Sequence, residues 1–156
     1  MVYHERFMQQ ALAEARLAFD DGEVPVGAVV VLGEQVIGRG HNQTLKLNDP
    51  TAHAEILAIT AAAAAVGNQR LEGCRLYVTL EPCPMCAGAV VNARLAQLFF
   101  GAYDARAGAA GTLYTITTDP RLNHQTETLG GILDLQSAAL LREFFQARRG
   151  KGGLQQ

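Results

Sequence analysis

The sequence predicts an α/β fold in which a mixed β-sheet carries helices on both of its faces. Two strand-like segments, at residues 25–32 and 35–40, are separated only by the turn Gly33-Glu34, as in an antiparallel hairpin. From about residue 53 onward, helix-like and strand-like segments alternate, which is typical of helices that connect parallel strands. The chain has 156 residues, of which 49% are hydrophobic and 18% charged, a composition typical of one globular domain with a substantial core.

The spacing of apolar residues places each element along the chain. Amphipathic spacing indicates the first and last helices, and continuous β-branched or apolar runs indicate the strands. Gly22 and Gly67 follow two of the helices and can end them, and five consecutive alanines, at residues 61–65, suggest a helix packed tightly on the sheet. The expected elements are a helix at 3–21, strands at 25–32 and 35–40, a helix at 53–66, a strand at 75–79, a helix at 83–92, strands at 96–101 and 126–133, and a helix at 135–149.

Two long stretches between these elements are expected to be loops. One is the polar segment 41–51, and the other is the glycine- and alanine-rich segment 102–111. A loop as long as the segment 102–111 is more often functional than accidental. Residues 112–118 fit a helix and a strand equally well, and Gly130-Gly131 weakens the last strand.

The formal charge does not by itself indicate a nucleic-acid partner, because 13 basic and 15 acidic residues give a net charge of −2. The segment 139–156 is nevertheless basic, with four Lys or Arg residues and one acidic residue. A basic, flexible tail at about 150–156 could contact phosphates. Alternatively, these cations belong to a solvated helix end, where they favour the helix dipole.

Cysteine use and hydropathy indicate a cytoplasmic protein. Of the three cysteines, two lie in a metal-like motif, which argues against a disulfide framework and for a reducing compartment. No apolar segment of the signal-peptide type follows residues 1–6. The longest apolar run, at 56–66, is too short to cross a bilayer, so no membrane partner is expected.

The segment 79–88, Thr-Leu-Glu-Pro-Cys-Pro-Met-Cys-Ala-Gly, carries the strongest chemical signal of the chain. Cys83 and Cys86 lie three residues apart at the predicted start of a helix, so both thiols can project from one face towards one metal ion. The helix N-terminus favours the thiolate forms that zinc requires. Pro82 and Pro84 suit this position, because the first helical turn does not use their missing N–H groups.

A third zinc ligand must come from elsewhere in the chain, and His53 is the best candidate because it also opens a predicted helix. One His and two Cys leave the fourth position for water, as in catalytic zinc sites. Glu55 lies two residues further on, near enough to reach the same space without binding the metal. The pattern His-x-Glu followed by Pro-Cys-x-x-Cys is the signature of zinc nucleobase deaminases, and segments 53–55 and 82–86 match every specified position.

Hydrolytic deamination uses water to replace an amino group on an aromatic ring carbon. Zinc held by His53, Cys83 and Cys86 would activate that water at neutral pH. Glu55 would take a proton from the water, deliver it to the neighbouring ring nitrogen and help to protonate the departing ammonia. One carboxylate thus serves both as base and as acid.

Each of these residues also has a simpler interpretation. His53 could be a helix cap, and Glu55 could merely suit the helix dipole. The Cys-x-x-Cys pair could be a redox motif or half of a structural zinc ribbon. A redox motif leaves His53 and Glu55 unexplained, and a ribbon needs a second such pair. The remaining cysteine, Cys74, is isolated in the sequence and fits a small core residue.

Over residues 3–149 the chain resembles the bacterial tRNA-specific adenosine deaminases, which belong to the cytidine deaminase superfamily. The resemblance implies a three-layer α/β/α sandwich of the cytidine-deaminase type with about five strands, one Zn²⁺ per subunit and a homodimer. It also implies conversion of the wobble adenosine in a tRNA anticodon, that of an arginine tRNA, to inosine. The matching segments are 22–28, 41–42, 50–55, 76–88, 100–102 with 104, 109–112 and 123–124.

The resemblance assigns substrate contacts as well. It implies that Asn42 hydrogen-bonds the flipped adenine and that the backbone of Ala54 lies near the reacting amino group. Asp104 and Asn123 would contact the neighbouring anticodon nucleotides. The amide of Asn42 suits adenine because it offers both a donor and an acceptor, although without the resemblance Asn42 is equally well a turn residue. An anticodon loop suits the reaction because its bases leave the stack at little cost.

The departures from the family pattern concern RNA contact more than chemistry. Gln136-Ser137 stands where the family commonly has Glu-Cys or Ala-Cys, the tail is less basic, and Tyr103 and Arg106 occupy variable positions beside the substrate loop. The alternative function is deamination of a free base or nucleoside, of guanine or cytosine type, by the same zinc chemistry. A non-catalytic zinc or RNA-binding module is a second alternative, which the presence of Glu55 disfavours.

Overall fold

The computed structural model describes residues 2–150, which form one β-sheet and the helices around it. No helix in this part of the chain is long and apolar enough to span a membrane. The elements in chain order are α1 (Val2–Asp20), β1 (Gly27–Leu32), β2 (Gln35–His41), α2 (Ala54–Val66), β3 (Arg75–Leu80), α3 (Pro84–Asn92), β4 (Gln97–Ala102), the 3₁₀ helix η1 (Ile116–Thr118), β5 (Glu127–Leu129) and α4 (Asp134–Gly150).

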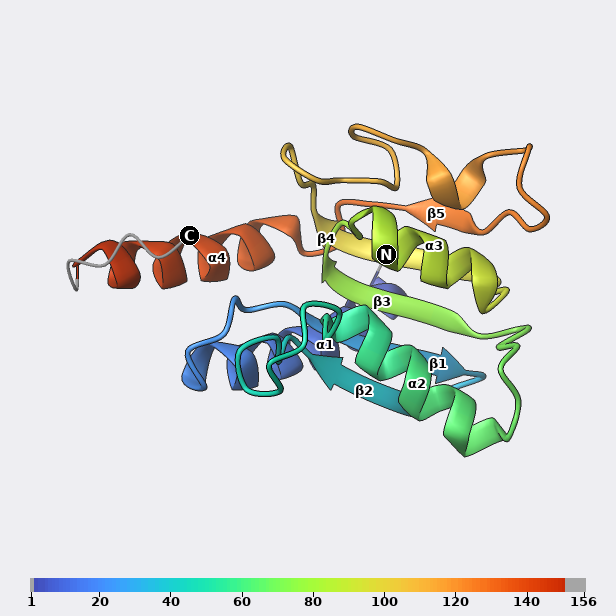
Figure 1. Cartoon of the computed structure of the whole chain (residues 1–156), viewed down its shortest axis with the longest axis horizontal. Helices are drawn as coiled ribbons and strands as arrows, with labels where there is room; N and C mark the ends of the chain where they lie inside the picture. The colour runs from blue at the N-terminus through green and yellow to red at the C-terminus, as the bar shows by residue number, and fades with distance from the viewer. Residues whose placement is uncertain (1, 151–156) are drawn as a thin grey trace.

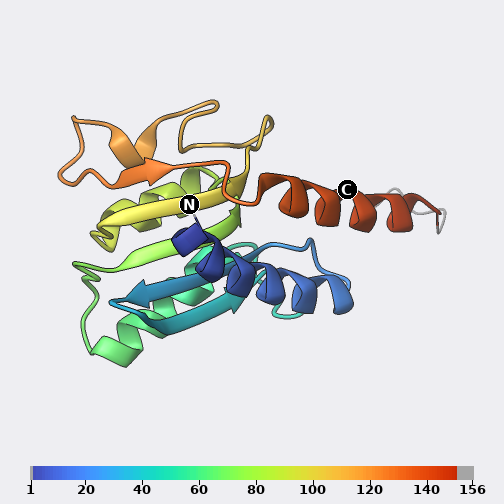
Figure 2. The same cartoon turned by 180° about the vertical axis from the view of Figure 1, so that it is seen from behind.

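The sheet has five strands in the order β2-β1-β3-β4-β5. Strand β1 is antiparallel to β2 and β3, whereas β3, β4 and β5 are parallel to one another. Helices α2 and α3 cover one face of the sheet (Figure 1), and α1 lies along the other face (Figure 2). Helix α4 starts on the same side as α1 and extends past the end of the strands (Figures 1 and 2). The predicted mixed sheet and three-layer α/β/α arrangement are therefore confirmed.

The central strands are buried on both faces, as the β-branched run at 25–32 predicted. Val29, Val30 and Val31 are all fully buried. Because side chains alternate across a strand, Val30 packs in the core under α2 and α3, whereas Val29 and Val31 pack under α1. The α2–α3 side also contains Leu76, Val78, Leu98 and Phe100, and the α1 side contains Phe7, Met8, Ala11, Tyr77 and Phe99.

Helix α2 lies unusually close to β2, because two glycines face it. A Cβ added to Gly38 would collide with the carbonyl oxygen of Ala58, and one added to Gly40 would lie 2.5 Å from that of Ala54. The alanine run predicted this close approach, but the residues that make it are spaced four apart, at Ala54, Ala58 and Ala62. Ala61, Ala64 and Ala65 are exposed.

The structure differs from the predicted elements mainly at the end of the sheet. The strand expected at 126–133 is confined to β5, because Gly131 and Leu133 adopt positive φ angles of 90° and 55°, which cannot continue a strand. Residues 112–118 form neither a regular helix nor a strand; they contain an isolated bridge from Ala110 to Thr115 and then η1. The tail expected at 150–156 lies outside the described residues except for Gly150.

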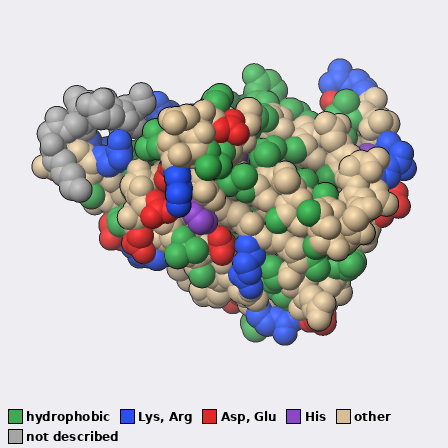
Figure 3. Space-filling model, turned by 60° about the horizontal axis from the view of Figure 1, so that its bottom comes forward, with side chains coloured by type: hydrophobic (Ala, Val, Ile, Leu, Met, Phe, Trp, Pro, Cys, Tyr) green, Lys and Arg blue, Asp and Glu red, His purple; other side chains and the backbone are tan. Residues whose placement is uncertain are grey.

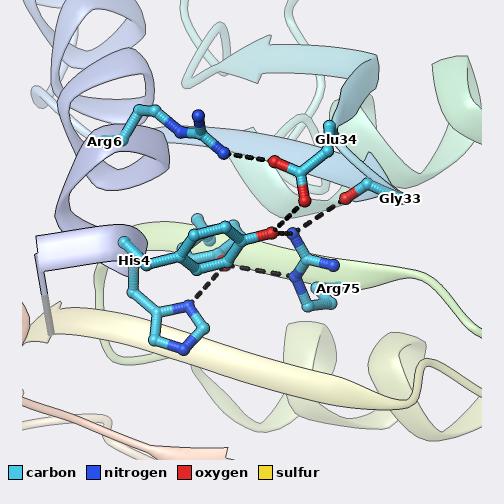
Figure 4. Close-up of polar contacts among 7 residues, drawn as sticks. His4, Arg6, Gly33, Glu34 and Arg75 are labelled. Carbon is cyan, nitrogen blue, oxygen red and sulfur yellow. Dashed lines mark hydrogen bonds and ion pairs between the residues drawn. The ribbon is translucent and has the colours of Figure 1, made fainter.

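A polar network joins α1, the β1–β2 turn and β3 on the α1 side of the sheet (Figure 4). Arg75 donates to the hydroxyl groups of Tyr3 and Tyr77, at 3.1 and 3.2 Å, and to the carbonyl oxygen of Gly33 at 3.1 Å. His4 Nδ1 lies 2.7 Å from the Tyr77 hydroxyl, and Tyr3 and Arg6 both donate to Glu34. These contacts fix α1 on the sheet, on the face opposite α2 and α3.

Replacing Gly38 with Ala is expected to destabilise the protein by roughly 1 to 3 kcal/mol, because α2 must move away from β2 to admit the methyl group. Gly88→Ala is the matched control. No heavy atom lies within 4 Å of a Cβ added at Gly88, which lies inside α3. This change should stabilise the protein by about 0.5 to 1 kcal/mol through helix propensity. Denaturant unfolding of both variants measures the difference, and equal stabilities would contradict the close packing of α2.

Candidate active site

Helices α2 and α3 begin beside each other at the carboxyl end of β3, and the predicted metal ligands stand at their first residues. His53 is the N-cap of α2, and Cys83 is the N-cap of α3; both have extended backbones and make no side-chain capping hydrogen bond. Pro84 opens α3, as predicted. The two helix N-termini therefore present His53, Cys83 and Cys86 to one space at the edge of the sheet, where open α/β sheets bind ligands.

The three predicted ligands are close enough to share one metal ion. His53 Nδ1 lies 3.7 Å from Cys83 Sγ and 3.4 Å from Cys86 Sγ, and all three atoms lie within 4.8 Å of one another. A tetrahedral zinc with Zn–S of about 2.3 Å and Zn–N of about 2.0 Å separates sulfur from nitrogen by about 3.5 Å. The residues therefore fit zinc. Cys74 is buried elsewhere in the core, among the residues that pack against α2 and α3.

The pKa shifts of the three side chains also favour metal binding. Hydrogen bonds from Cys86 and, to a smaller extent, with His53 lower the pKa of Cys83 to about 4, although burial acts in the opposite direction. The same sharing of a proton raises the pKa of Cys86, and burial raises it as well. The hydrogen bond with Cys83 raises the pKa of His53, although burial acts in the opposite direction. The lowered pKa of Cys83 favours the thiolate that zinc binds, and a zinc ion would displace the proton from the thiol of Cys86.

A cavity of about 330 Å³ opens beside the three ligands, and Asn42, Ala54, Glu55 and Asp104 line it. Its volume lies at the lower end of the range for small-molecule sites. Glu55 is only 4% exposed, and burial raises the pKa of its carboxyl group to about 7. A carboxyl group that titrates near neutrality can both take and give a proton. Its oxygens are not among the group of atoms that could share the metal.

Asn42 lies on the cavity wall and also shapes its own loop. Its Nδ2 donates to the carbonyl oxygen of Val24 at 3.3 Å, and its Oδ1 accepts from the backbone N–H of Thr44 at 3.4 Å. The turn function that the sequence left open is therefore present. One N–H and one lone pair of the amide remain for a ligand.

Comparison with known proteins places the chain in a family. The model of the MafB19-like deaminases matches residues 2–149. The tRNA-specific adenosine deaminase of Bacillus subtilis (strain 168) is 46% identical over 151 residues, which cover 97% of this chain and 94% of that protein. The chain belongs to the tRNA-specific adenosine deaminases.

Solved structures support this family assignment. A structure from a study of A-to-I editing by tRNA:A34 deaminases at the wobble position shares 46% identity and a TM-score of 0.83, covering 86% of this chain and 98% of that one. The guanine deaminase of Nitrosomonas europaea is more distant, with 28% identity and a TM-score of 0.74 over 90% of this chain and 83% of that one. The cytidine-deaminase-like fold is thus shared with enzymes that act on free bases, so the fold alone does not select a substrate.

The two residues expected to contact flanking nucleotides lie at different places in this structure. Asp104 lines the cavity, and its Oδ1 accepts from the backbone N–H groups of Arg106 and Ala107 at 2.9 and 3.2 Å. Asn123 is exposed and precedes β5, and its carbonyl oxygen accepts from Arg94, which precedes β4. Asn123 therefore lies at the opposite end of β4 from Asp104, and the structure does not bring it to the cavity.

Two buried glutamates beside the cavity were not predicted as functional residues. Glu23 is 1% exposed and accepts from the backbone N–H groups of Leu45 and Lys46, at 3.1 and 2.8 Å. Glu81 is 2% exposed and accepts from the loop that carries Asp104. A glutamate outside regular structure is ordinarily solvated. The only signal in the sequence was that both residues fall within segments that match the family.

The surface charge agrees with the near-neutral composition. On the face that Figure 3 shows, basic side chains lie singly or in small groups between acidic, hydrophobic and neutral ones. Arg148 and Arg149 occupy the last turn of α4, and Arg148 donates to the carbonyl oxygen of Gly22 at 3.4 Å. These arginines fit the interpretation of cations at a helix end. RNA contacts on the face shown would depend on individual cations rather than on a broad basic surface.

Proposed function

We propose that this chain is a zinc-dependent deaminase that converts the wobble adenosine of a tRNA anticodon, that of an arginine tRNA, to inosine in the cytoplasm. The observation that carries the proposal is the group of His53, Cys83 and Cys86 beside a cavity that also holds the buried Glu55. The choice of tRNA as substrate rests on the 46% identity with the tRNA-specific adenosine deaminase of Bacillus subtilis.

The proposed chemistry assigns a role to each polar group of the cavity. His53, Cys83 and Cys86 would hold one zinc ion, which supplies a water molecule acidified enough to attack a ring carbon near neutral pH. Glu55 takes a proton from that water and gives it to the adjacent ring nitrogen. Glu55 would then carry the remaining proton of the added hydroxyl group to the amino group, so that the C–N bond breaks, ammonia leaves and the ring carbon keeps a C=O bond. The buried position of Glu55 favours this shuttle, because burial holds the pKa of the carboxyl group near neutrality.

The remaining cavity residues would position the base. The free N–H and lone pair of Asn42 can pair with the ring edge of adenine. Ala54 lines the cavity next to His53, and its backbone would lie near the reacting amino group. Asp104 stands at the same cavity and would contact a neighbouring nucleotide. Asn123 would meet RNA outside the cavity, since it lies at the opposite end of β4.

The proposed assembly is a homodimer, in which the single deaminase domain forms each subunit. Large hydrophobic side chains remain exposed in the described part of the chain; Leu113 and Tyr114, for example, are 51% and 57% exposed. A contact between subunits would remove such side chains from water. Sedimentation of the purified protein tests this assembly, and a monomer at micromolar concentration would contradict it.

Salt dependence separates the tRNA deaminase from a deaminase of free bases. With an anticodon stem-loop as substrate, kcat/KM is expected to fall steeply between about 50 and 200 mM salt, because each phosphate contact releases counterions. With a neutral nucleoside, kcat/KM should change little over the same range. Measuring both substrates with one zinc-loaded preparation provides the control. Salt-independent turnover of the stem-loop would contradict recognition of RNA phosphates.

A further inference from the structure

The buried carboxylate of Glu81, in the segment 79–88 that carries Cys83 and Cys86, accepts hydrogen bonds from the loop between β4 and η1. Glu81 Oε1 accepts from the backbone N–H of Asp104 at 3.0 Å and from the hydroxyl group of Thr112. Oε2 accepts from the backbone N–H groups of Ala110 and Thr112, at 3.1 and 3.0 Å. One side chain therefore holds both ends of the loop that spans residues 104–112.

Pro82, which follows Glu81, also makes a hydrogen bond to this loop. The backbone N–H of Ala109 donates to the carbonyl oxygen of Pro82 at 2.8 Å. Glu81 and Pro82 directly precede Cys83, the N-cap of α3. The loop that carries Asp104 and Ala107 to the cavity is thus tied to the segment that carries the metal ligand. Movement of the loop would require loss of several hydrogen bonds at once, with a buried charge left unpaired.

Gly108 of the loop packs directly against the carboxyl group of Glu81. A Cβ added to Gly108 would collide with Glu81 Oε1 and would lie 2.6 Å from the carbonyl oxygen of Asp104. Each carboxylate oxygen of Glu81 accepts two hydrogen bonds from the loop, so its acceptor sites are all used there. It has no capacity left to act on a substrate.

We infer that Glu81 is a positioning residue that fixes the 104–112 loop relative to Cys83. It thereby holds Asp104 at a constant position relative to the metal ligands, so that both can contact one substrate. The inference rests on the proposed function for what the loop contacts, but the fixing of the loop can be measured without any substrate. It differs from a catalytic role, since Glu81 acts only through the loop.

The primary test is Glu81→Gln, which keeps the size of the side chain. A Gln amide has one oxygen and one NH₂ group, so in either orientation the NH₂ faces at least one backbone N–H of the loop. The loop must then shift. Thr112→Val is a milder variant, because it removes only the hydroxyl donor. Tyr77→Phe is the matched control: Tyr77 is fully buried on the face opposite α2 and α3, and its hydroxyl group contacts only the network of Figure 4.

Amide hydrogen exchange measures directly how strongly the loop amides are protected. In Glu81→Gln, the amides of Asp104, Ala110 and Thr112 are expected to exchange on the order of 10-fold to 100-fold faster, and those of β1 should keep their protection. Thr112→Val should show a smaller increase, and Tyr77→Phe none in the loop. Unchanged exchange of the loop amides in Glu81→Gln would overturn the inference.

Kinetics on an anticodon stem-loop then distinguish positioning from mere stabilisation. Glu81→Gln should raise KM roughly 10-fold or more, with a smaller effect on kcat and with full zinc content. A faster-exchanging loop with unchanged KM would overturn the positioning role. If the wild-type protein does not deaminate the stem-loop, the proposed function fails, and exchange of the loop amides alone still supports or overturns the fixing of the loop by Glu81.

Discussion

Glu55→Gln is expected to retain zinc and to lower kcat roughly 100-fold to 10,000-fold, because the amide cannot accept a proton from water or return one to the base. The substitution keeps the shape of a side chain that is only 4% exposed, so the fold and the group of His53, Cys83 and Cys86 should remain. Single-turnover deamination and zinc analysis of the same preparation measure both effects.

The control for this variant is Glu72→Gln, which changes an exposed glutamate outside the cavity. It should leave turnover and zinc content unchanged. Loss of zinc from Glu55→Gln would show that Glu55 is a metal ligand. Retention of turnover would show that another group moves the proton.

Cys83→Ala and Cys86→Ala are each expected to lose zinc and, with it, all deamination above background. Each substitution leaves only two protein ligands, and a catalytic zinc site needs three. Zinc content after gel filtration gives the primary measurement. A chelator should lower the unfolding temperature of the wild type but not that of either variant, because bound metal stabilises only the folded state.

Cys74→Ala is the control for these two variants, because Cys74 is a buried cysteine that is not expected to bind zinc. Cys74 is 1% exposed and packs in the core under α2 and α3. The variant should lose about 1 kcal/mol of stability and keep its full zinc content and activity. A zinc-free Cys74→Ala protein would show that the three ligands were assigned wrongly.

The regular elements could be predicted because local signals determine them. Gly67 ends α2 in the left-handed conformation, with a φ of 70°, as its place after the apolar run indicated. The grouping of His53, Cys83 and Cys86 could also be predicted, since the two cysteines lie three residues apart at one helix start and His53 lies at the start of a second helix. The hairpin and the alternation of helices and strands predicted the mixed sheet, and the resemblance added its three-layer type and about five strands. The proximity of the N-termini of α2 and α3 could not be predicted from local sequence, because it depends on the fold.

What the sequence did not reveal depends on contacts between distant segments. Glu81 accepts from residues 23 to 31 positions further along the chain, and no local pattern marks such a partner. The distance of Asn123 from the cavity depends likewise on distant segments, since it follows from the parallel register of β4 and β5. The shortness of β5 was only suggested by Gly130-Gly131, because the positive φ of Leu133 has no local signal.

The central claim is that this cavity edits an adenosine within RNA. The most direct measurement incubates the zinc-loaded protein with an anticodon stem-loop bearing a wobble adenosine, and in parallel with adenosine, guanine and cytidine. Inosine at the wobble position, without product from the three small substrates, is the predicted result. Product from a free base or nucleoside alone would keep the roles of zinc and Glu55 but contradict RNA as the substrate.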